Sequence, residues 1–106
     1  MLLDRAVFRM YVKDGCPYCD KAREIITRDL SSTLQAIDVT NHPDLQRNVA
    51  KETGHKTVPA IFLGDEFVGG CDDLSEKAGS SDFRVRVLTE EVNILRSEIM
   101  RLRRSF

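Results

Sequence analysis

The sequence has few cysteines, almost no excess of charge and no long apolar run. Its 106 residues carry a net charge of −1, so no overall field favours nucleic acid or an anionic membrane. No stretch approaches the roughly 20 apolar residues of a membrane span, and the early Asp4 and short apolar start are unlike a secretory signal. Three cysteines are too few for a disulfide framework and are typical of a reducing compartment. We therefore expect a cytoplasmic protein, one small domain with an appended element, without nucleic-acid or membrane partners.

What the sequence does have is a pair of cysteines two residues apart, in the motif Cys-Pro-Tyr-Cys at residues 16–19. The motif follows an apolar run over residues 6–12 that predicts a strand, and it begins a segment over residues 17–30 that predicts a helix. Cys16 would therefore lie at a helix N-terminus, where free N–H groups and the helix dipole favour the thiolate that attacks disulfides. Cys19 would lie one turn further on, close enough to attack a mixed disulfide formed at Cys16. We expect both cysteines to be catalytic.

Two other interpretations of the cysteine pair remain open at this point. A Cys-x-x-Cys pair is also half of a zinc site, and the chain offers Cys71, His42 and His55 as further ligands. These three do not form a second closely spaced pair, which is the usual arrangement in structural zinc sites, so we expect no metal. A purely structural disulfide would close too short a loop to restrain the unfolded chain much.

The remaining pattern predicts an α/β fold with the element order βαβαββα up to Ala78. A second strand is expected at residues 34–39, less apolar and nearer a sheet edge, and the strand–helix–strand unit predicts a right-handed parallel crossover. A second helix is expected from Pro43 to a stop at Gly54. Two short strands at residues 58–63 and 66–68 would form a hairpin, and a short helix would follow up to residue 78.

Three spaced motifs, in this order, resemble those of the dithiol glutaredoxins. They are Cys-Pro-Tyr-Cys at 16–19, Thr-Val-Pro at 57–59 and Gly-Gly-Cys-Asp-Asp at 69–73, and Lys13 also matches. The resemblance covers about residues 6–78. It implies a thioredoxin-like fold with a mixed sheet flanked by helices, glutathione as cosubstrate, and reduction of protein disulfides and protein–glutathione mixed disulfides. It also implies a cis Val58–Pro59 bond, which the base rate for X-Pro bonds would not favour by itself.

The same resemblance implies a glutathione site beside the dithiol. Lys13 would meet the glycine carboxylate as a point charge, with Lys56 and His55 adding charge on the same side. The backbone of Val58 would pair with the cysteinyl part of glutathione. Gly70, after Gly69, would allow the close approach of backbone to the ligand.

The γ-glutamyl end would lie at the start of the helix that follows. The N–H groups of Cys71 and Asp72 would hold its carboxylate and Asp73 its ammonium, although both aspartates would serve equally as helix caps. We expect the Cys71 thiol to be idle; the alternative is that it oxidises or becomes glutathionylated. The whole expected glutathione site comprises Lys13, Tyr18, Lys56, Thr57, Val58, Pro59, Gly70, Cys71, Asp72 and Asp73.

Residues 80–106 lie outside the resemblance and form a strongly helix-favouring segment. Apolar residues recur there at spacings of three and four, as the a and d positions of a heptad repeat, namely Val85, Leu88, Val92, Leu95, Ile99, Leu102 and Phe106. β-Branched residues at a with leucine at d favour two parallel strands, and Glu91 with Arg96, and Glu98 with Arg103, would pair across a dimer. We expect residues 1–79 to form a glutaredoxin-like domain and residues 80–106 a helix that joins copies into a homo-oligomer.

Two points about this helix stay open. Val87 and Ile94 are apolar but lie off the stripe, so they would pack on the redox domain or on further chains, and a tetramer is possible. Alternatively, the stripe itself packs on its own domain. The arginines at the C-terminal end are expected of any helix and are weak evidence for nucleic acid.

The sequence thus predicts a glutathione-dependent thiol–disulfide oxidoreductase in which Cys16 attacks and Cys19 resolves. A first alternative is a glutathione-ligated iron–sulfur cluster carrier that uses Cys16 across a dimer, which Pro17 disfavours by the same resemblance. A second is an oligomerisation module whose redox domain has no turnover. A third is a thioredoxin-type enzyme that a flavoprotein reductase turns over.

Overall fold

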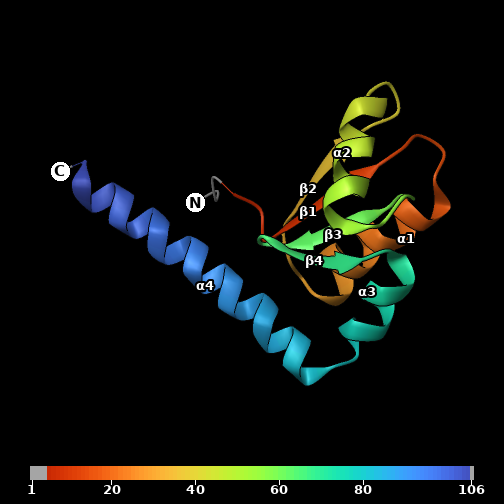
Figure 1. Cartoon of the computed structure of the whole chain (residues 1–106). Helices are drawn as coiled ribbons and strands as arrows, with labels where there is room; N and C mark the ends of the chain where they lie inside the picture. Colours follow the sequence, from red (N-terminus) through yellow and green to blue (C-terminus); the bar gives the residue numbers. More distant parts are fainter. Residues whose placement is uncertain (1–4, 106) are drawn as a thin grey trace.

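The computed structural model describes residues 5–105, so the expectations for residues 1–4 and for Phe106 lie outside the described part of the chain. The elements follow the expected order βαβαββα, with one long helix added at the end (Figure 1). They are β1 (Phe8–Val12), α1 (Pro17–Glu24), η1 (Ile25–Asp29), β2 (Leu34–Asp38), α2 (Pro43–Thr53), β3 (Ala60–Leu63), β4 (Glu66–Gly69), α3 (Cys71–Ala78) and α4 (Ser81–Arg104).

The four strands form one mixed sheet in the order β2-β1-β3-β4. β1 pairs with β2 in parallel, as expected for a strand–helix–strand unit, and it pairs with β3 antiparallel. Met10 on β1 therefore has Ala36 on one side and Ile61 on the other. The less apolar β2 lies at an edge, whereas all four residues of the central β3 are buried, because both faces of that strand are covered.

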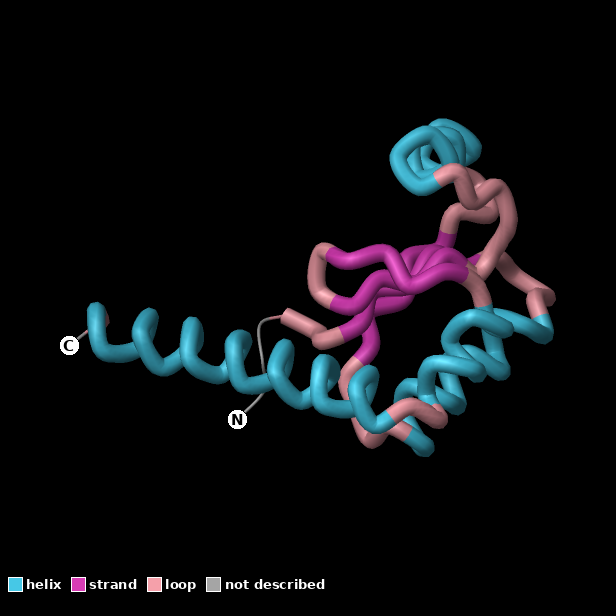
Figure 2. The backbone as a smooth tube through the Cα atoms, turned by 60° about the horizontal axis from the view of Figure 1, so that its bottom comes forward, coloured by secondary structure: helices cyan, strands magenta, loops and turns pink. Residues whose placement is uncertain are grey.

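Helices cover the two faces of the sheet unequally. Along β1 the side chains of Phe8, Met10 and Val12 are buried on the face that α1 and α3 cover. The intervening Tyr11 faces the other way and joins a smaller cluster beneath α2. Figure 2 shows α2 alone on one side of the sheet, with the other helices on the opposite side. The larger core therefore lies beneath the helix that begins at the cysteine pair of residues 16–19.

The segment at residues 17–30 is not one regular α-helix. After α1 the chain makes a wider π-helical turn, η1, in which the Leu30 N–H donates to the Ile25 carbonyl oxygen at 2.9 Å. The expected single helix is wrong in this respect. In a regular α-helix the side chains of two adjacent residues point in directions about 100° apart. The wider turn brings the side chains of the adjacent Ile25 and Ile26 both into the core.

The last helix, α4, packs on the domain through residues in its first half and its middle. Phe83, Val87 and Ile94 contact the larger core, and the second half extends beyond the sheet in both views (Figures 1 and 2). Ser80 caps the helix, because its Oγ accepts a hydrogen bond from the Phe83 N–H at 3.4 Å. Among residues 5–105, no helix combines the length and apolarity that crossing a membrane requires.

Candidate functional site

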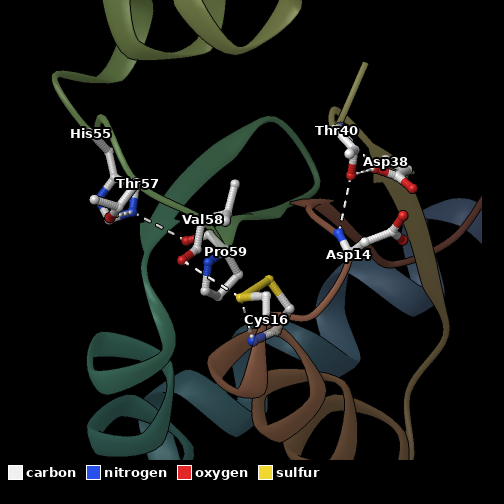
Figure 3. Close-up of a disulfide and its surroundings, with 9 residues drawn as sticks. Asp14, Cys16, Asp38, Thr40, His55, Thr57, Val58 and Pro59 are labelled. Carbon is white, nitrogen blue, oxygen red and sulfur yellow. Dashed lines mark hydrogen bonds between the residues drawn. A yellow bond between two sulfur atoms is a disulfide. The ribbon is translucent and has the colours of Figure 1, made fainter. Parts of the chain in front are cut away.

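The two cysteines of the motif lie at the beginning of α1 and form a disulfide, with their Cα atoms 5.2 Å apart (Figure 3). Cys16 is the N-cap of the helix, and its Sγ accepts a hydrogen bond from the Cys19 N–H at 3.1 Å. Pro17 occupies the first helical turn, where no backbone donor is needed. Cys19 is only 3% exposed, whereas Cys16 is half-buried. Cys16 is therefore the sulfur that an incoming molecule reaches first.

A short hydrogen-bond chain anchors the loop before Cys16. The Asp14 N–H donates to Thr40 Oγ1 at 3.0 Å, and the Thr40 hydroxyl donates to Asp38 Oδ1 at 2.5 Å (Figure 3). Hydrogen bonds from the hydroxyl and the N–H of Thr40 lower the pKa of the Asp38 carboxyl below its usual value. The site predicted from the sequence did not include these hydrogen bonds of Thr40. An Asp two residues before a Thr at a strand end is a recognisable turn motif that could have indicated them.

The expected cis bond between Val58 and Pro59 is confirmed. This bond lies opposite the dithiol, and Cys16 Sγ is 4.0 Å from the Val58 carbonyl oxygen (Figure 3). Val58 is half-buried against the larger core, which fixes the position of its backbone. The loop before β3 thus forms one wall of a cleft that lies beside Cys16.

His55 contacts the loop that forms this wall and fixes its position. Its Nε2 lies 3.1 Å from the Pro59 carbonyl oxygen and 3.2 Å from Thr57 Oγ1, and its ring centroid is 5.6 Å from that of Phe67. A Cβ added at Gly70 would lie 3.2 Å from His55 Cε1, so the imidazole also lies directly under the opposite wall. Sequence reasoning treated His55 as a source of positive charge, and its contacts are instead those of a residue that positions both walls.

The second wall is the turn into α3. Gly69 has φ +127°, and a Cβ there would collide with the Asp73 carboxylate, which accepts a hydrogen bond from the Gly70 N–H at 3.1 Å. Asp73 therefore acts as a helix cap for α3, which is the alternative role that the sequence analysis named for it. Cys71 is only 4% exposed, and burial raises the pKa of its thiol, which disfavours the reactive thiolate.

Between the two walls lies a cleft of about 210 Å³. Its lining comprises Tyr18, His55, Thr57, Val58, Pro59, Gly70, Cys71, Asp72 and Asp73. Eight of the ten expected glutathione-site residues thus line one cleft, and the remaining two, Lys13 and Lys56, are exposed and lie outside that lining. A larger hollow of about 420 Å³, near Glu90 and Ile94, is lined by none of the ten expected glutathione-site residues. We assign the chemistry to the smaller cleft, because its lining includes Val58, whose carbonyl oxygen is 4.0 Å from Cys16 Sγ.

A metal centre was the other interpretation of the cysteine pair. Across residues 5–105, no three histidine, cysteine or acidic side chains come together in a way that could hold a metal ion.

A reducible cysteine pair at a helix N-terminus, facing a cis-proline loop on a mixed sheet, defines a thiol–disulfide oxidoreductase of the thioredoxin-like fold. Among solved structures, the chain is similar to a buckwheat glutaredoxin–glutathione complex at 30% identity and a TM-score of 0.69, which covers 80% of this chain and 78% of that one. The family model described as Glutaredoxin matches residues 8–68, and the chain belongs to this family.

Curated relatives extend the match over most of the domain. A glutaredoxin of Pseudomonas aeruginosa is 39% identical over 75 residues, which cover 69% of this chain and 88% of the relative. Human glutaredoxin-1 is 34% identical over 83 residues, which cover 74% of this chain and 78% of the relative. The expectation of a glutaredoxin with an added C-terminal helix is confirmed.

Proposed function

We propose that the protein is a glutathione-dependent oxidoreductase that reduces protein–glutathione mixed disulfides and protein disulfides. The observation that carries this proposal is a cleft beside the Cys16–Cys19 disulfide, which is lined by Val58 and by the first residues of α3. Its backbone walls suit an extended tripeptide whose thiol must reach Cys16. The similar buckwheat protein, described as a complex with glutathione, supports the same ligand.

Glutathione would lie in the cleft with its sulfur at Cys16. The Val58 backbone would pair with the cysteinyl part, and the N–H groups of Cys71 and Asp72 at the start of α3 would hold the γ-glutamyl carboxylate. Asp73 already accepts from Gly70, and its second oxygen would meet the ammonium. Tyr18, Thr57 and Pro59 would complete the lining, while the exposed Lys13 and Lys56 would attract the glycine carboxylate from outside.

The reaction on a glutathionylated protein needs Cys16 alone. The Cys16 thiolate attacks the glutathione sulfur, the protein leaves as a thiolate that takes a proton from water, and Cys16 becomes glutathionylated. A second glutathione thiolate then attacks that disulfide, which releases glutathione disulfide and restores the Cys16 thiolate. In the net reaction the incoming glutathione thiol is oxidised to the disulfide level, the protein sulfur is reduced to a thiol, and the glutathionyl group of the substrate leaves as half of glutathione disulfide.

Reduction of a protein disulfide uses both cysteines. Cys16 forms a mixed disulfide with one substrate sulfur, Cys19 attacks Cys16, and the reduced protein leaves. The chain is left with the Cys16–Cys19 disulfide, which is the state described above. Two further glutathione molecules reduce that disulfide and leave as glutathione disulfide.

We propose a cytoplasmic location, because a glutathione-reduced dithiol works in a reducing compartment. We also propose a division of labour, in which residues 1–79 carry the redox chemistry and residues 80–106 make the chain a homo-oligomer.

The test of the redox proposal is a coupled assay of glutathione-dependent reduction on the intact chain. Lys13→Glu should raise the KM for glutathione at least about fivefold, the factor that corresponds to losing about 1 kcal/mol of ion pairing. Asp73→Asn should do the same while it keeps an acceptor for the Gly70 N–H. Lys77→Glu, near the far end of α3, is the matched charge reversal and should leave the KM unchanged.

The outcome also separates the alternatives. No turnover with glutathione, but turnover with a flavoprotein reductase, would replace the proposal by a thioredoxin-type activity. Purified protein that is brown, with visible absorbance lost on Cys16→Ser, would favour an iron–sulfur cluster carrier.

A further inference from the structure

The large apolar side chains that the chain leaves exposed are gathered on one helix. Among the described residues, seven of the eight belong to α4, and the eighth is Tyr18 in the cleft. The seven are Val85, Leu88, Val92, Leu95, Ile99, Met100 and Leu102, with exposed fractions between 36% and 60%. Six of them are the a and d positions of the heptad repeat, called here the a/d stripe. A contiguous exposed stripe of this kind marks an interaction surface.

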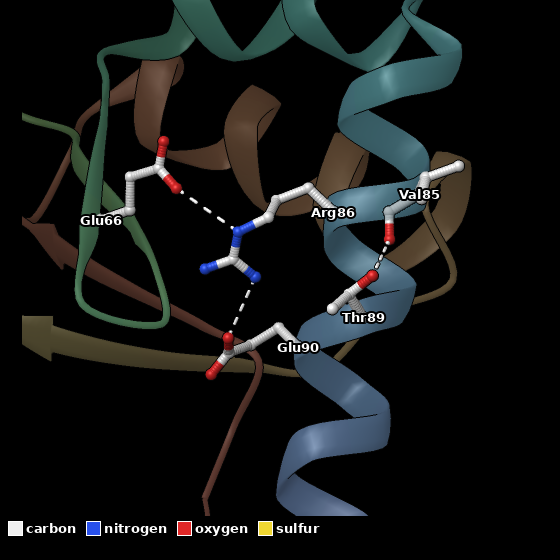
Figure 4. A network of polar contacts seen from close by, with 5 residues as sticks. All are labelled: Glu66, Val85, Arg86, Thr89 and Glu90. Carbon is white, nitrogen blue, oxygen red and sulfur yellow. Dashed lines mark hydrogen bonds and ion pairs between the residues drawn. The ribbon is translucent and has the colours of Figure 1, made fainter.

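The domain of the same chain does not cover the a/d stripe, because it holds the helix by another face. Val87 and Ile94, at c positions, are 3% and 4% exposed within the larger core. On the same side, Arg86 pairs with Glu66 at 3.4 Å and with Glu90 at 3.0 Å, while Val85 points away from these contacts (Figure 4). The alternative in which the stripe packs on its own domain is therefore wrong for the single chain.

We propose that the a/d stripe binds the same stripe of a second copy, with the two α4 helices parallel. This inference rests on the proposed homo-oligomer and adds its surface and orientation. β-Branched residues at the three a positions with leucine at the three d positions favour two parallel strands. Because Val87 and Ile94 are already buried inside each chain, the described part of α4 leaves only the single residue Met100 exposed as a large apolar side chain outside the a/d stripe, so a second copy is enough to cover the stripe.

The surface around Leu95 has the shape that such a pair requires. A shallow hollow there is lined by Val92, Leu95, Arg96 and Ile99, with Met100 and Arg103 at its side. In a parallel pair Leu95 meets Leu95 of the second copy, whose side chain enters the hole formed by these four residues. The hollow is thus present in the single chain, and Leu95 of the second copy would fill it.

Charge complementarity favours the same arrangement. Glu91 occupies a g position and Arg96 the following e position. In a parallel dimer, Glu91 of one copy therefore pairs with Arg96 of the other copy, and the reverse pair forms as well. Glu98, by contrast, is 8% exposed and pairs with Arg101 of its own helix. The pairing of Glu98 within its own helix makes the expected pair with Arg103 of a second copy a weaker argument than that of Glu91 with Arg96.

The contacts to the domain also lower the cost of association. A free helix of about three heptads is marginal in water, because nucleating and ordering it is unfavourable. Here Phe83, Val87 and Ile94 order α4 on the core from its first turn to its middle before any second copy arrives. Preorganisation of this kind is a general way in which a short interface reaches useful affinity.

The oligomeric state of the intact chain tests the surface. Light scattering after gel filtration at tens of micromolar should give a dimer. Leu95→Asp should raise the dissociation constant at least about 100-fold, because the dimer would bury a charge in the stripe. Asn93→Asp adds the same charge at the exposed b position and should leave the dimer intact. An intact chain that stays monomeric overturns the homo-oligomer, whereas a dimer that survives Leu95→Asp overturns only this surface.

Oxidative cross-linking tests the orientation, in a chain carrying Cys16→Ser, Cys19→Ser and Cys71→Ala. Leu102→Cys should form a disulfide with its own copy, because equal d positions meet in a parallel pair. Mixing chains that carry Val85→Cys with chains that carry Leu102→Cys should give no 85–102 cross-link. The opposite pattern would show an antiparallel pair. Near-normal melting of these variants, read by circular dichroism, verifies that they are folded.

Discussion

At the scale of single residues, the two sulfur atoms of the site differ in how far solvent reaches them. Cys16 caps α1 at the edge of the cleft, and Cys19 lies inside the core beside Ala22. An accessible nucleophile paired with a shielded partner suits a sequence of attack followed by internal resolution. The buried Cys71 has no part in this sequence, since burial disfavours its thiolate.

We expect Cys16→Ser to abolish both reductase activities, because the attacking sulfur is gone. Cys19→Ser should keep the reduction of glutathionylated substrates and lose the reduction of protein disulfides, which needs the second sulfur. Parallel assays on a glutathionylated protein and on a disulfide-bonded protein measure the two activities. Equal loss of deglutathionylation in the two variants would contradict the assigned roles.

His55 gives a second prediction at this scale. His55→Leu removes the donor to the Pro59 carbonyl oxygen, so the KM for glutathione should rise about fivefold, with kcat less affected. His55→Gln retains a donor near the position of Nε2 and should restore most of the KM. The carbonyl ¹³C shift of Pro59, read through the Ala60 amide, follows the hydrogen bond directly. If His55→Leu and His55→Gln give the same KM for glutathione and the same carbonyl ¹³C shift of Pro59, the hydrogen bond of His55 does not contribute and the residue acts only through packing.

At the scale of elements, sequence patterns worked where one local rule decided the outcome. The Cys-Pro-Tyr-Cys motif at 16–19 predicted a helix N-terminus, and the heptad spacing predicted which face of α4 stays free. The turn at η1 was missed, because a π-helical turn depends on how Ile25 and Ile26 pack against the sheet rather than on local propensity. The support that Thr40 gives to Asp14 was missed for a similar reason, since the two residues are 26 apart in sequence.

The part of α4 up to Ile94 packs as part of the redox domain, and this gives a prediction for the element. Ile94→Ala should lower the free energy of unfolding by about 2–4 kcal/mol, because it leaves a cavity between α4 and the core. Leu88→Ala, on the exposed face, should cost much less when the protein is dilute enough to be monomeric. Urea denaturation followed by circular dichroism at low protein concentration compares the two. Equal losses would mean that Ile94 contributes nothing to the domain.

At the scale of the whole molecule, the cysteine pair and the free end of α4 lie on opposite sides. The dithiol lies at the N-terminus of α1, and the free end of α4 extends away on the other side in both views (Figures 1 and 2). Association through the a/d stripe therefore leaves both clefts open to protein substrates. We expect Leu95→Asp to change the oligomeric state without changing kcat for a glutathionylated peptide, and a fall in kcat would place the stripe in substrate binding.

Pairing through the a/d stripe would also make the melting temperature depend on protein concentration. By mass action, a folded chain that pairs with its own copy is stabilised more as its concentration rises, whereas an unpaired chain melts at one temperature throughout. For a domain of this size, a tenfold dilution should lower the melting temperature of the intact chain by about 3–5 °C until the pairs have separated. Leu95→Asp should melt at the same temperature at every dilution. A melting series is therefore a measure of how much of the chain is paired at each concentration.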